Sequence, residues 1–135
     1  MASDTIVKID PVCVMYTKGI EGAPIAEQAP LAFRQLEAEL PSLKGKKFYG
    51  VIIDDEYRAC VAIDHNSEAT SLPYPIWTIP GGKYVRRKIP DWEKNIHLIG
   101  PSFDDLCQTP VFDSSRPLIE FYRSQKELRL MVPVF

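Results

Sequence analysis

The sequence predicts an α+β domain built from tandem strand-helix-strand-strand repeats. Two observations carry this prediction. First, residues 48–63 and 118–134 share one pattern, an apolar strand, a short polar tip, and a second strand that opens with Glu-x-Arg. Second, a short amphipathic helical pattern precedes each of these hairpins. Because neither half can bury its apolar face alone, we expect antiparallel sheets that pair with pseudo-two-fold symmetry and leave a ligand groove between the repeats.

The first repeat covers residues 8–63, approximately. Its expected elements are, in order, a strand at 11–18, a helix at 30–40 and the hairpin at 48–63. In the helical segment "PLAFRQLEAEL", Phe33 and Leu36 are three residues apart and therefore share one helix face. Pro30 suits the first turn of such a helix, where a backbone N–H is not needed.

The second repeat covers residues 76–135 and follows a connector at 64–75 that is rich in turn-forming residues. Its expected elements are, in order, a strand at 82–89, a helix at 100–108 and the hairpin at 118–134. Phe103 and Leu106 repeat the spacing of the first helix, and Pro101 again falls in the expected first turn. Both repeats belong to a single domain, since 135 residues are too few for two independent cores.

The composition excludes several classes of protein. A hydrophobic content of 45% and a charged content of 25% are ordinary for a soluble globular chain. No apolar run approaches the ~20 residues of a membrane span, and the N-terminus lacks the pattern of a signal peptide. We therefore expect a cytoplasmic protein without a membrane partner. The net charge of -2 and a single basic cluster at 83–88 argue against direct binding of nucleic acid.

Residues that carry the commonest catalytic and metal chemistry are sparse. Cys13, Cys60 and Cys107 lie far apart without CxxC spacing, so they predict reduced thiols rather than a disulfide framework. With only His65 and His97, and with neither GxSxG nor HExxH, the sequence predicts no metal site and no cofactor.

A carboxylate in the segment "PLIEFYRS" (117–124) is the residue that most needs explaining. Glu120 stands among apolar residues typical of a half-buried strand, on the same face as Leu118 and Tyr122 by the two-residue period. If buried, its carboxylate would form the floor of a pocket, and Tyr122 would line that pocket. In the first repeat the matching position is Gly50, where a missing side chain would leave room.

The opposing hypothesis is that Glu120 is solvated or forms an ion pair. Arg58 and Arg129 are expected in strands next to it and could supply the partner. The alternation of residue types does not decide between the two hypotheses.

Three segments of the chain resemble a known family. "IPGGKY" (79–84) opens the second repeat, "PLIEFY" (117–122) fills the penultimate strand, and "LMVPV" (130–134) ends the chain. Together with the tandem repeats they resemble the GyrI-like domain, also called the effector-binding domain of BmrR-type multidrug-sensing transcription regulators. The resemblance covers nearly the whole chain, and we expect a stand-alone form of this domain that does not bind DNA.

The resemblance implies an aromatic pocket between the repeats with a glutamate at its bottom. In this sequence that glutamate is Glu120, and the aromatic wall draws on Tyr57, Tyr84 and Phe33. Leu128 stands where relatives of this type have another tyrosine, so one wall is expected to be less aromatic.

The aromatic residues also have a simpler interpretation as core. Phe33 at helical spacing, and Tyr57 and Tyr84 in strands, are residues that commonly pack in a protein interior. Trp77, just before the glycine pair, and Trp92, after a proline-aspartate step, could each roof a groove or pack in the core.

These residues support three functions of different classes. The leading hypothesis is a stand-alone protein that captures amphipathic cationic or aromatic small molecules, such as a drug or toxin, in an aromatic pocket floored by Glu120. The second is a hydrolase of reactive genotoxic small molecules, with Glu120 as general acid or base. The third is a protein-interaction module whose groove binds a peptide.

Overall fold

The computed structural model describes residues 4–19, 25–39, 46–54, 56–63, 74–124 and 126–135. Two α-helices, two short 3-10 helices and eight strands lie in these ranges. In chain order they are β1 (Thr5–Ile9), β2 (Val12–Lys18), α1 (Ile25–Glu39), β3 (Phe48–Ile53), β4 (Glu56–Ala62), β5 (Ile76–Ile79), β6 (Gly82–Pro90), η1 (Trp92–Lys94), η2 (Ile96–Leu98), α3 (Ile99–Leu106), β7 (Leu118–Tyr122) and β8 (Glu127–Pro133). The protein is α+β, as the sequence predicts.

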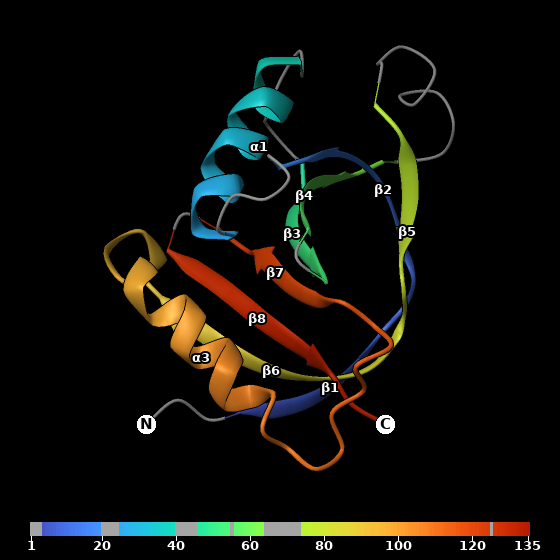
Figure 1. The fold of residues 1–135 in the computed structure, drawn as a ribbon, viewed down its shortest axis with the longest axis vertical. Helices are drawn as coiled ribbons and strands as arrows, with labels where there is room; N and C mark the ends of the chain where they lie inside the picture. The colour runs from blue at the N-terminus through green and yellow to red at the C-terminus, as the bar shows by residue number, and fades with distance from the viewer. Residues whose placement is uncertain (1–3, 20–24, 40–45, 55, 64–73, 125) are drawn as a thin grey trace.

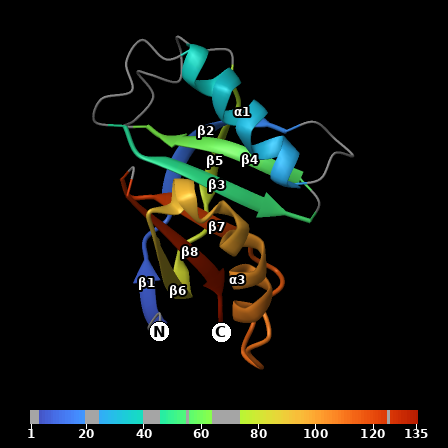
Figure 2. The ribbon, with the colours of Figure 1, turned by 90° about the vertical axis from the view of Figure 1, so that its left-hand side faces the viewer.

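All eight strands form one curved sheet, in the order β1-β6-β8-β7-β3-β4-β2-β5 (Figure 1). Every pair of neighbouring strands is antiparallel. The sheet curves into a half-barrel, and α1 and α3 lie on the same side of it, α1 over the first half and α3 over the second (Figure 2).

The two halves of the chain contribute strands in matching order. From the outside inwards the second half gives β6, β8 and β7, and the first half gives β2, β4 and β3. The halves meet where β3 pairs with β7, and at the middle of that pairing Gly50 lies directly opposite Glu120. Pseudo-two-fold symmetry in space and a groove between the halves stay predictions.

Both hairpins and both strands that precede the helices are where the sequence predicts them. The first helix differs, because α1 begins at Ile25 and therefore holds Pro30 in its interior rather than in its first turn. Strands β1 and β5 were not expected. Each pairs with a strand of the other half, β1 with β6 and β5 with β2, so the halves interlock at both edges of the sheet. Most of the predicted connector, residues 64–73, lies outside the described residues.

The two faces of the sheet bury different cores. On the face toward the helices there are two clusters. One includes Leu36 of α1 and Tyr57 of β4, and the other includes Phe103 of α3 and Leu130 of β8. The other face forms a third cluster, which includes Val14 of β2 and Tyr84 of β6. Since β2 and β6 lie near opposite ends of the strand order, the sheet must curve around this cluster.

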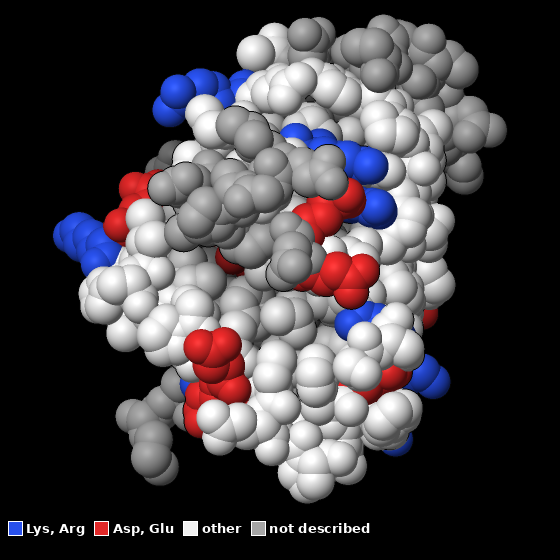
Figure 3. All heavy atoms as spheres, in the orientation of Figure 1, with Lys and Arg blue, Asp and Glu red and all other residues white. Residues whose placement is uncertain are grey.

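On the side seen in Figure 3, the acidic and basic side chains of the described residues are scattered among uncharged ones and form no large patch of one charge. Within the described ranges, no helix has the length and apolar character needed to cross a membrane.

Candidate functional site

Glu120 lies in the middle of the sheet, on the face that the helices cover. It is the third residue of the five-residue strand β7, and it pairs in register with Gly50 on β3 and Leu130 on β8. Only 5% of its surface is exposed. The strand period that puts Ile119 and Phe121 in the opposite core puts Glu120 beneath the helices, with Leu118 and Tyr122.

Two tyrosine hydroxyls donate hydrogen bonds to one oxygen of this carboxylate. The distance to Glu120 Oε1 is 2.6 Å from Tyr57 Oη and 2.9 Å from Tyr122 Oη. The other oxygen, Oε2, accepts no hydrogen bond from the residues that the structure describes. Among those residues no fully buried polar side-chain atom lacks a partner, so Oε2 must keep a small exposed surface.

Gly50 makes this arrangement possible. A Cβ atom at this position would collide with both the Tyr57 hydroxyl and Glu120 Oε1. The room that the sequence predicts opposite Glu120 therefore exists, and the hydroxyl and the carboxylate fill it. A close approach of this kind is a common reason for glycine inside a strand.

The hypothesis that Glu120 pairs with an arginine is wrong. The Arg58 guanidinium contacts Glu56 at 2.5 Å, and the Arg129 guanidinium contacts Glu127 at 2.6 Å. Strand alternation turns both arginines to the face opposite Glu120. Within the described ranges, no basic side chain forms an ion pair with Glu120.

Burial controls the titration of this cluster. Removal from water raises the pKa of Glu120 above its ordinary value, and the hydrogen bonds from Tyr57 and Tyr122 oppose that rise only in part. Burial, with the nearby Glu120 charge, also raises the pKa of both tyrosines well above the usual value. The hydroxyls therefore keep their protons and act as donors, while the carboxylate has no compensating positive charge among the described residues.

Aromatic rings surround the two tyrosines. Phe33 of α1 lies edge-on to both, with its ring centroid 6.1 Å from that of Tyr57 and 5.1 Å from that of Tyr122. Trp92 of η1 also lies edge-on to Tyr122, with ring centroids 5.1 Å apart. Glu120 therefore adjoins a continuous cluster of aromatic rings contributed by a helix, two strands and a 3-10 helix.

Four of the six residues that the sequence predicts for the site come together in this cluster. They are Glu120, Tyr122, Tyr57 and Phe33. Tyr84 and Trp77 instead belong to the core inside the curve of the sheet. Ile119 of β7 is in that same core, on the face of the sheet opposite Glu120. Trp77 packs there edge-on to Tyr16, with ring centroids 6.4 Å apart.

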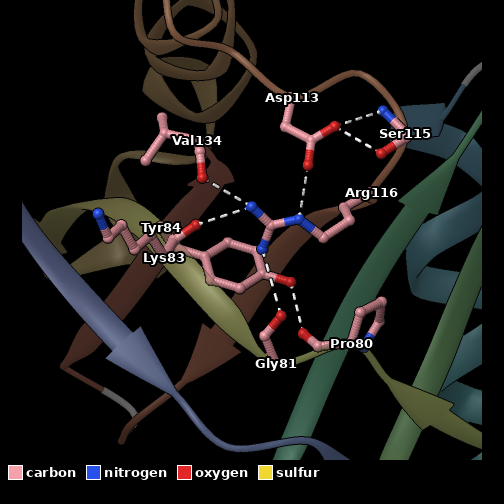
Figure 4. Close-up of polar contacts among 8 residues, drawn as sticks. All are labelled: Pro80, Gly81, Lys83, Tyr84, Asp113, Ser115, Arg116 and Val134. Carbon is pink, nitrogen blue, oxygen red and sulfur yellow. Dashed lines mark hydrogen bonds and ion pairs between the residues drawn. The ribbon is translucent and has the colours of Figure 1, made fainter.

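Tyr84 takes part in a separate polar cluster, which Figure 4 shows. Its hydroxyl donates to the Pro80 carbonyl at 2.6 Å, and the Arg116 guanidinium lies over its ring, 4.9 Å from the centroid. Arg116 also donates to Asp113 at 2.8 Å. Its remaining hydrogen bonds go to the backbone carbonyls of Gly81, Lys83 and Val134. This cluster ties the segment before β7 to the start of β6 and the end of β8.

Trp92, which the sequence offers as a possible roof of a groove or as a core residue, is not among the six predicted site residues. Its position after a proline-aspartate step indicates a turn, and sequence spacing cannot show which strand a turn residue contacts. As for metals, no group of three or more His, Cys, Asp or Glu side chains in the described part of the chain is arranged to hold an ion.

A comparison with models of protein families finds no match to this sequence, and a search of curated proteins finds none either. Solved structures do match. An integron cassette protein from the mobile metagenome of Vibrio cholerae has a TM-score of 0.76 at 14% identity, over 98% of this chain and 95% of that one. SAV2435, solved bound to tetraphenylphosphonium, has a TM-score of 0.66 at 16% identity, over 98% and 94%. A hydrolase from Listeria innocua has a TM-score of 0.57 at 12% identity, over 98% and 91%. At these identities the likeness shows a shared fold.

Proposed function

We propose that this protein binds lipophilic, aromatic cations at Glu120. One observation carries the proposal: a carboxylate that is 5% exposed, held by two tyrosine hydroxyls, with no basic partner among the described residues. The site lies where the two halves of the chain meet, which is where the GyrI-like resemblance expects a ligand groove.

The energetics favour a positively charged ligand. An ionised carboxylate transferred from water to an apolar interior costs several kcal/mol unless a charge partner compensates it. Hydroxyl donors compensate only part of that cost, because they carry no net charge. A lipophilic cation would supply the missing charge at Oε2 while its apolar groups displace water from the aromatic rings.

The rings of Phe33, Tyr57, Tyr122 and Trp92 suit such a ligand. A cation over a ring face gains roughly 0.5–2 kcal/mol, depending on how far water is excluded. Ring faces impose few directional requirements, so compounds of different shape would bind. SAV2435 supports the proposal, because it shares the fold and was solved with a lipophilic cation bound.

The test is titration of the protein with tetraphenylphosphonium by isothermal calorimetry. We expect binding that Glu120→Gln weakens at least ~10-fold, or about 1.4 kcal/mol. Glu127→Gln is the matched control, since Glu127 is paired with Arg129 on the other face and should leave affinity unchanged. Tetraphenylborate, an anion of nearly the same shape, should not bind.

Equal affinity of the native protein and Glu120→Gln for tetraphenylphosphonium would contradict the proposal, because the carboxylate would then not sense charge. If neither cation nor anion binds, the peptide-binding module becomes the better hypothesis.

Hydrolysis of a reactive small molecule is a second candidate function. It is favoured by the raised pKa of Glu120 and by Oε2, which accepts no hydrogen bond from the described residues. The carboxylate would take a proton from water while the water oxygen attacks an electrophilic carbon, and the leaving atom would then be protonated. A hydrolase also occurs among the proteins with this fold. Mass spectrometry of an electrophilic, cyclopropane-bearing aromatic compound should show addition of water with the native protein and none with Glu120→Gln. Recovery of unchanged compound would exclude this reaction.

A further inference from the structure

The site around Glu120 is closed in this structure. Tyr57 has no exposed surface and Glu120 only 5%, so a ligand the size of tetraphenylphosphonium cannot reach the carboxylate without movement of a covering element. Two elements carry rings that cover the site, namely α1 with Phe33 and η1 with Trp92. The inference below rests on the proposed function and concerns which of these two elements moves.

The first covering element, α1, is firmly attached. Ala32, Leu36 and Gln28 on its inner face are all at most 1% exposed. Gln28 Oε1 accepts the backbone N–H of Tyr57 at 3.2 Å, and the Thr17 hydroxyl donates to the Ala32 carbonyl at 3.3 Å. Movement of α1 would therefore expose buried apolar surface and break buried hydrogen bonds together.

The second covering element is weakly attached. The segment Asp91–Leu98, here called the Trp92 segment, includes η1 and η2, and neither 3-10 helix has a buried residue. Ile96 and Leu98 in this segment are 59% and 41% exposed. Trp92 is the residue of the segment that packs against a core cluster, the one that includes Phe103 and Leu130. With so few buried contacts, the segment is expected to have a lower local opening free energy than α1.

Three hydrogen bonds and one ring contact attach the Trp92 segment to β6 and to the β7–β8 hairpin, the first of them from Asn95 Nδ2 to the Pro90 carbonyl at 3.0 Å. Trp92 Nε1 donates to the Ser124 carbonyl at 3.0 Å, and the Asp91 N–H donates to the Lys126 carbonyl at 2.6 Å. The Trp92 ring meets Tyr122. Asp91 has φ 48° and ψ 49°, a left-handed conformation that aspartate and asparagine adopt more readily than most residues other than glycine, and the segment therefore leaves β6 through a sharp turn.

We propose that Trp92 is the movable wall of the ligand site and a determinant of its specificity. The Trp92 segment swings away from Tyr122 to admit an aromatic cation, then returns so that the indole packs on the bound ligand beside Tyr122. Indole is the aromatic side chain that attracts cations most strongly, so Trp92 selects ligands that carry aromatic rings next to the positive charge.

Fluorescence tests the contact directly, because the chain has two tryptophans and Trp77 lies in the other core. In Trp77→Phe, titration with tetraphenylphosphonium should change the emission of Trp92 and saturate at the calorimetric affinity. In Trp92→Phe, the emission of the remaining Trp77 should stay constant. Acrylamide should quench Trp92 less in the complex than in the free protein.

Two substitutions of Trp92 separate the contact of its ring with the ligand from its hydrogen bond to Ser124. Trp92→Ala should weaken tetraphenylphosphonium binding by about 10-fold, since one wall is lost. Trp92→Phe keeps a ring and loses the bond to Ser124, so it should change affinity less than about 3-fold while both association and dissociation become faster. Ile96→Ala, in the same segment but far more exposed, is the control and should match the native protein.

Two results would overturn the inference. If the native protein binds tetraphenylphosphonium through Glu120 but Trp92 emission and the Trp92→Ala affinity are unchanged, the site opens elsewhere and the proposed function still stands. If the native protein does not bind it at all, both proposals fail. The Trp77→Phe titration leaves Trp92 intact, so it decides the question even if Trp92→Ala does not fold.

Discussion

Asp113 and Glu120 are two buried carboxylates of nearly equal exposure, 7% and 5%, that the fold treats in opposite ways. Asp113 accepts hydrogen bonds from Ser115 and from the Arg116 guanidinium, and these bonds lower its pKa to about 2. Glu120 has only hydroxyl donors, and burial raises its pKa. Asp113 thus has its cation within the protein and stabilises a loop, whereas Glu120 has none among the described residues and is the proposed site for a cationic ligand.

Sequence separation explains how the two environments arise. The donors to Asp113 stand two and three residues after it, so a single loop supplies both the carboxylate and its cation. For Glu120, one donor comes from Tyr122 on the same strand and the other from Tyr57, 63 residues earlier, on a strand of the other half. The Glu120 cluster therefore forms only when the two halves pair.

Arg116→Met should give the largest loss of stability. The partly buried carbonyls of Gly81 and Val134 would lose this donor, and Asp113 would lose its cation, whereas the Lys83 carbonyl keeps the N–H of Val134. A buried acceptor left unsatisfied costs about 1–3 kcal/mol. We therefore expect the free energy of unfolding to fall by roughly 3 kcal/mol or more, measured by urea denaturation.

Measurement of ligand binding by the same variant tests whether the Arg116 and Glu120 clusters are independent. In the folded fraction of Arg116→Met, affinity for tetraphenylphosphonium should stay within about 3-fold of native, since the Arg116 and Glu120 clusters lie on different faces of the sheet. A large loss of affinity would show that the two clusters are coupled.

Gly50→Ala should come next in size and act at the other cluster. The new methyl would displace the Tyr57 hydroxyl from Glu120, and overpacking of this kind costs about 1–3 kcal/mol. Affinity for tetraphenylphosphonium should fall as well. The matched control is Gly100→Ala in α3, where a Cβ meets no atom within 4 Å; there, stability should be unchanged or rise by up to ~1 kcal/mol. Similar melting temperatures for the two variants would contradict the crowded geometry at Gly50.

The hairpins and the position of Glu120 in its strand could be predicted because they depend on local patterns. Alternation over five to seven residues and a polar tip identify β3–β4 and β7–β8 without knowledge of the rest of the chain. Strands β1 and β5 could not be predicted in this way, because β5 has four residues and each pairs with a distant strand of the other half. Their position depends on the assembled sheet rather than on their own sequence.

The residues that surround Glu120 were harder to predict than Glu120 itself. A two-residue period shows which residues of one strand share a face, but not which face of the sheet that strand presents, since register between strands decides it. Tyr57 and Tyr84 therefore look alike in sequence, although they lie on opposite faces. Trp92 reaches Tyr122 from a turn, a contact that no periodic pattern encodes.

The pH dependence of stability should have opposite sign for the two carboxylates. The pKa of Glu120 is higher in the folded protein than in the unfolded chain, so the native free energy of unfolding falls as pH rises between these two values. Glutamine does not ionise, so Glu120→Gln should not lose free energy of unfolding over this range. The variant should be more stable than the native protein at pH 7 and equally stable at a pH below the pKa of Glu120 in the unfolded chain.

For Asp113 the sign reverses. Its folded pKa of about 2 is below its ordinary value, so its contribution is complete above about pH 4 and is lost as pH falls toward 2. Asp113→Asn should therefore be less stable than native at pH 7 and approach it near pH 2. Thermal denaturation from pH 2 to pH 8 measures both; parallel curves for Glu120→Gln and the native protein would show that Glu120 titrates normally.

The smallest expected effects separate the two tyrosines that look alike in sequence. Tyr57→Phe and Tyr84→Phe each remove one buried hydroxyl that donates a short bond, at 2.6 Å in both cases, so each should lower the free energy of unfolding by about 1 kcal/mol. Binding should distinguish them. Tyr57→Phe removes a donor to Glu120 and makes the ionised carboxylate harder to form, so calorimetry should show weaker tetraphenylphosphonium binding at pH 7 and a partial recovery at higher pH. Tyr84→Phe should bind like the native protein at every pH, because its acceptor is the Pro80 carbonyl on the far face of the sheet. If both variants lost affinity alike, the ligand would contact the core inside the curve, and the assignment of the site to the helix-covered face would be wrong.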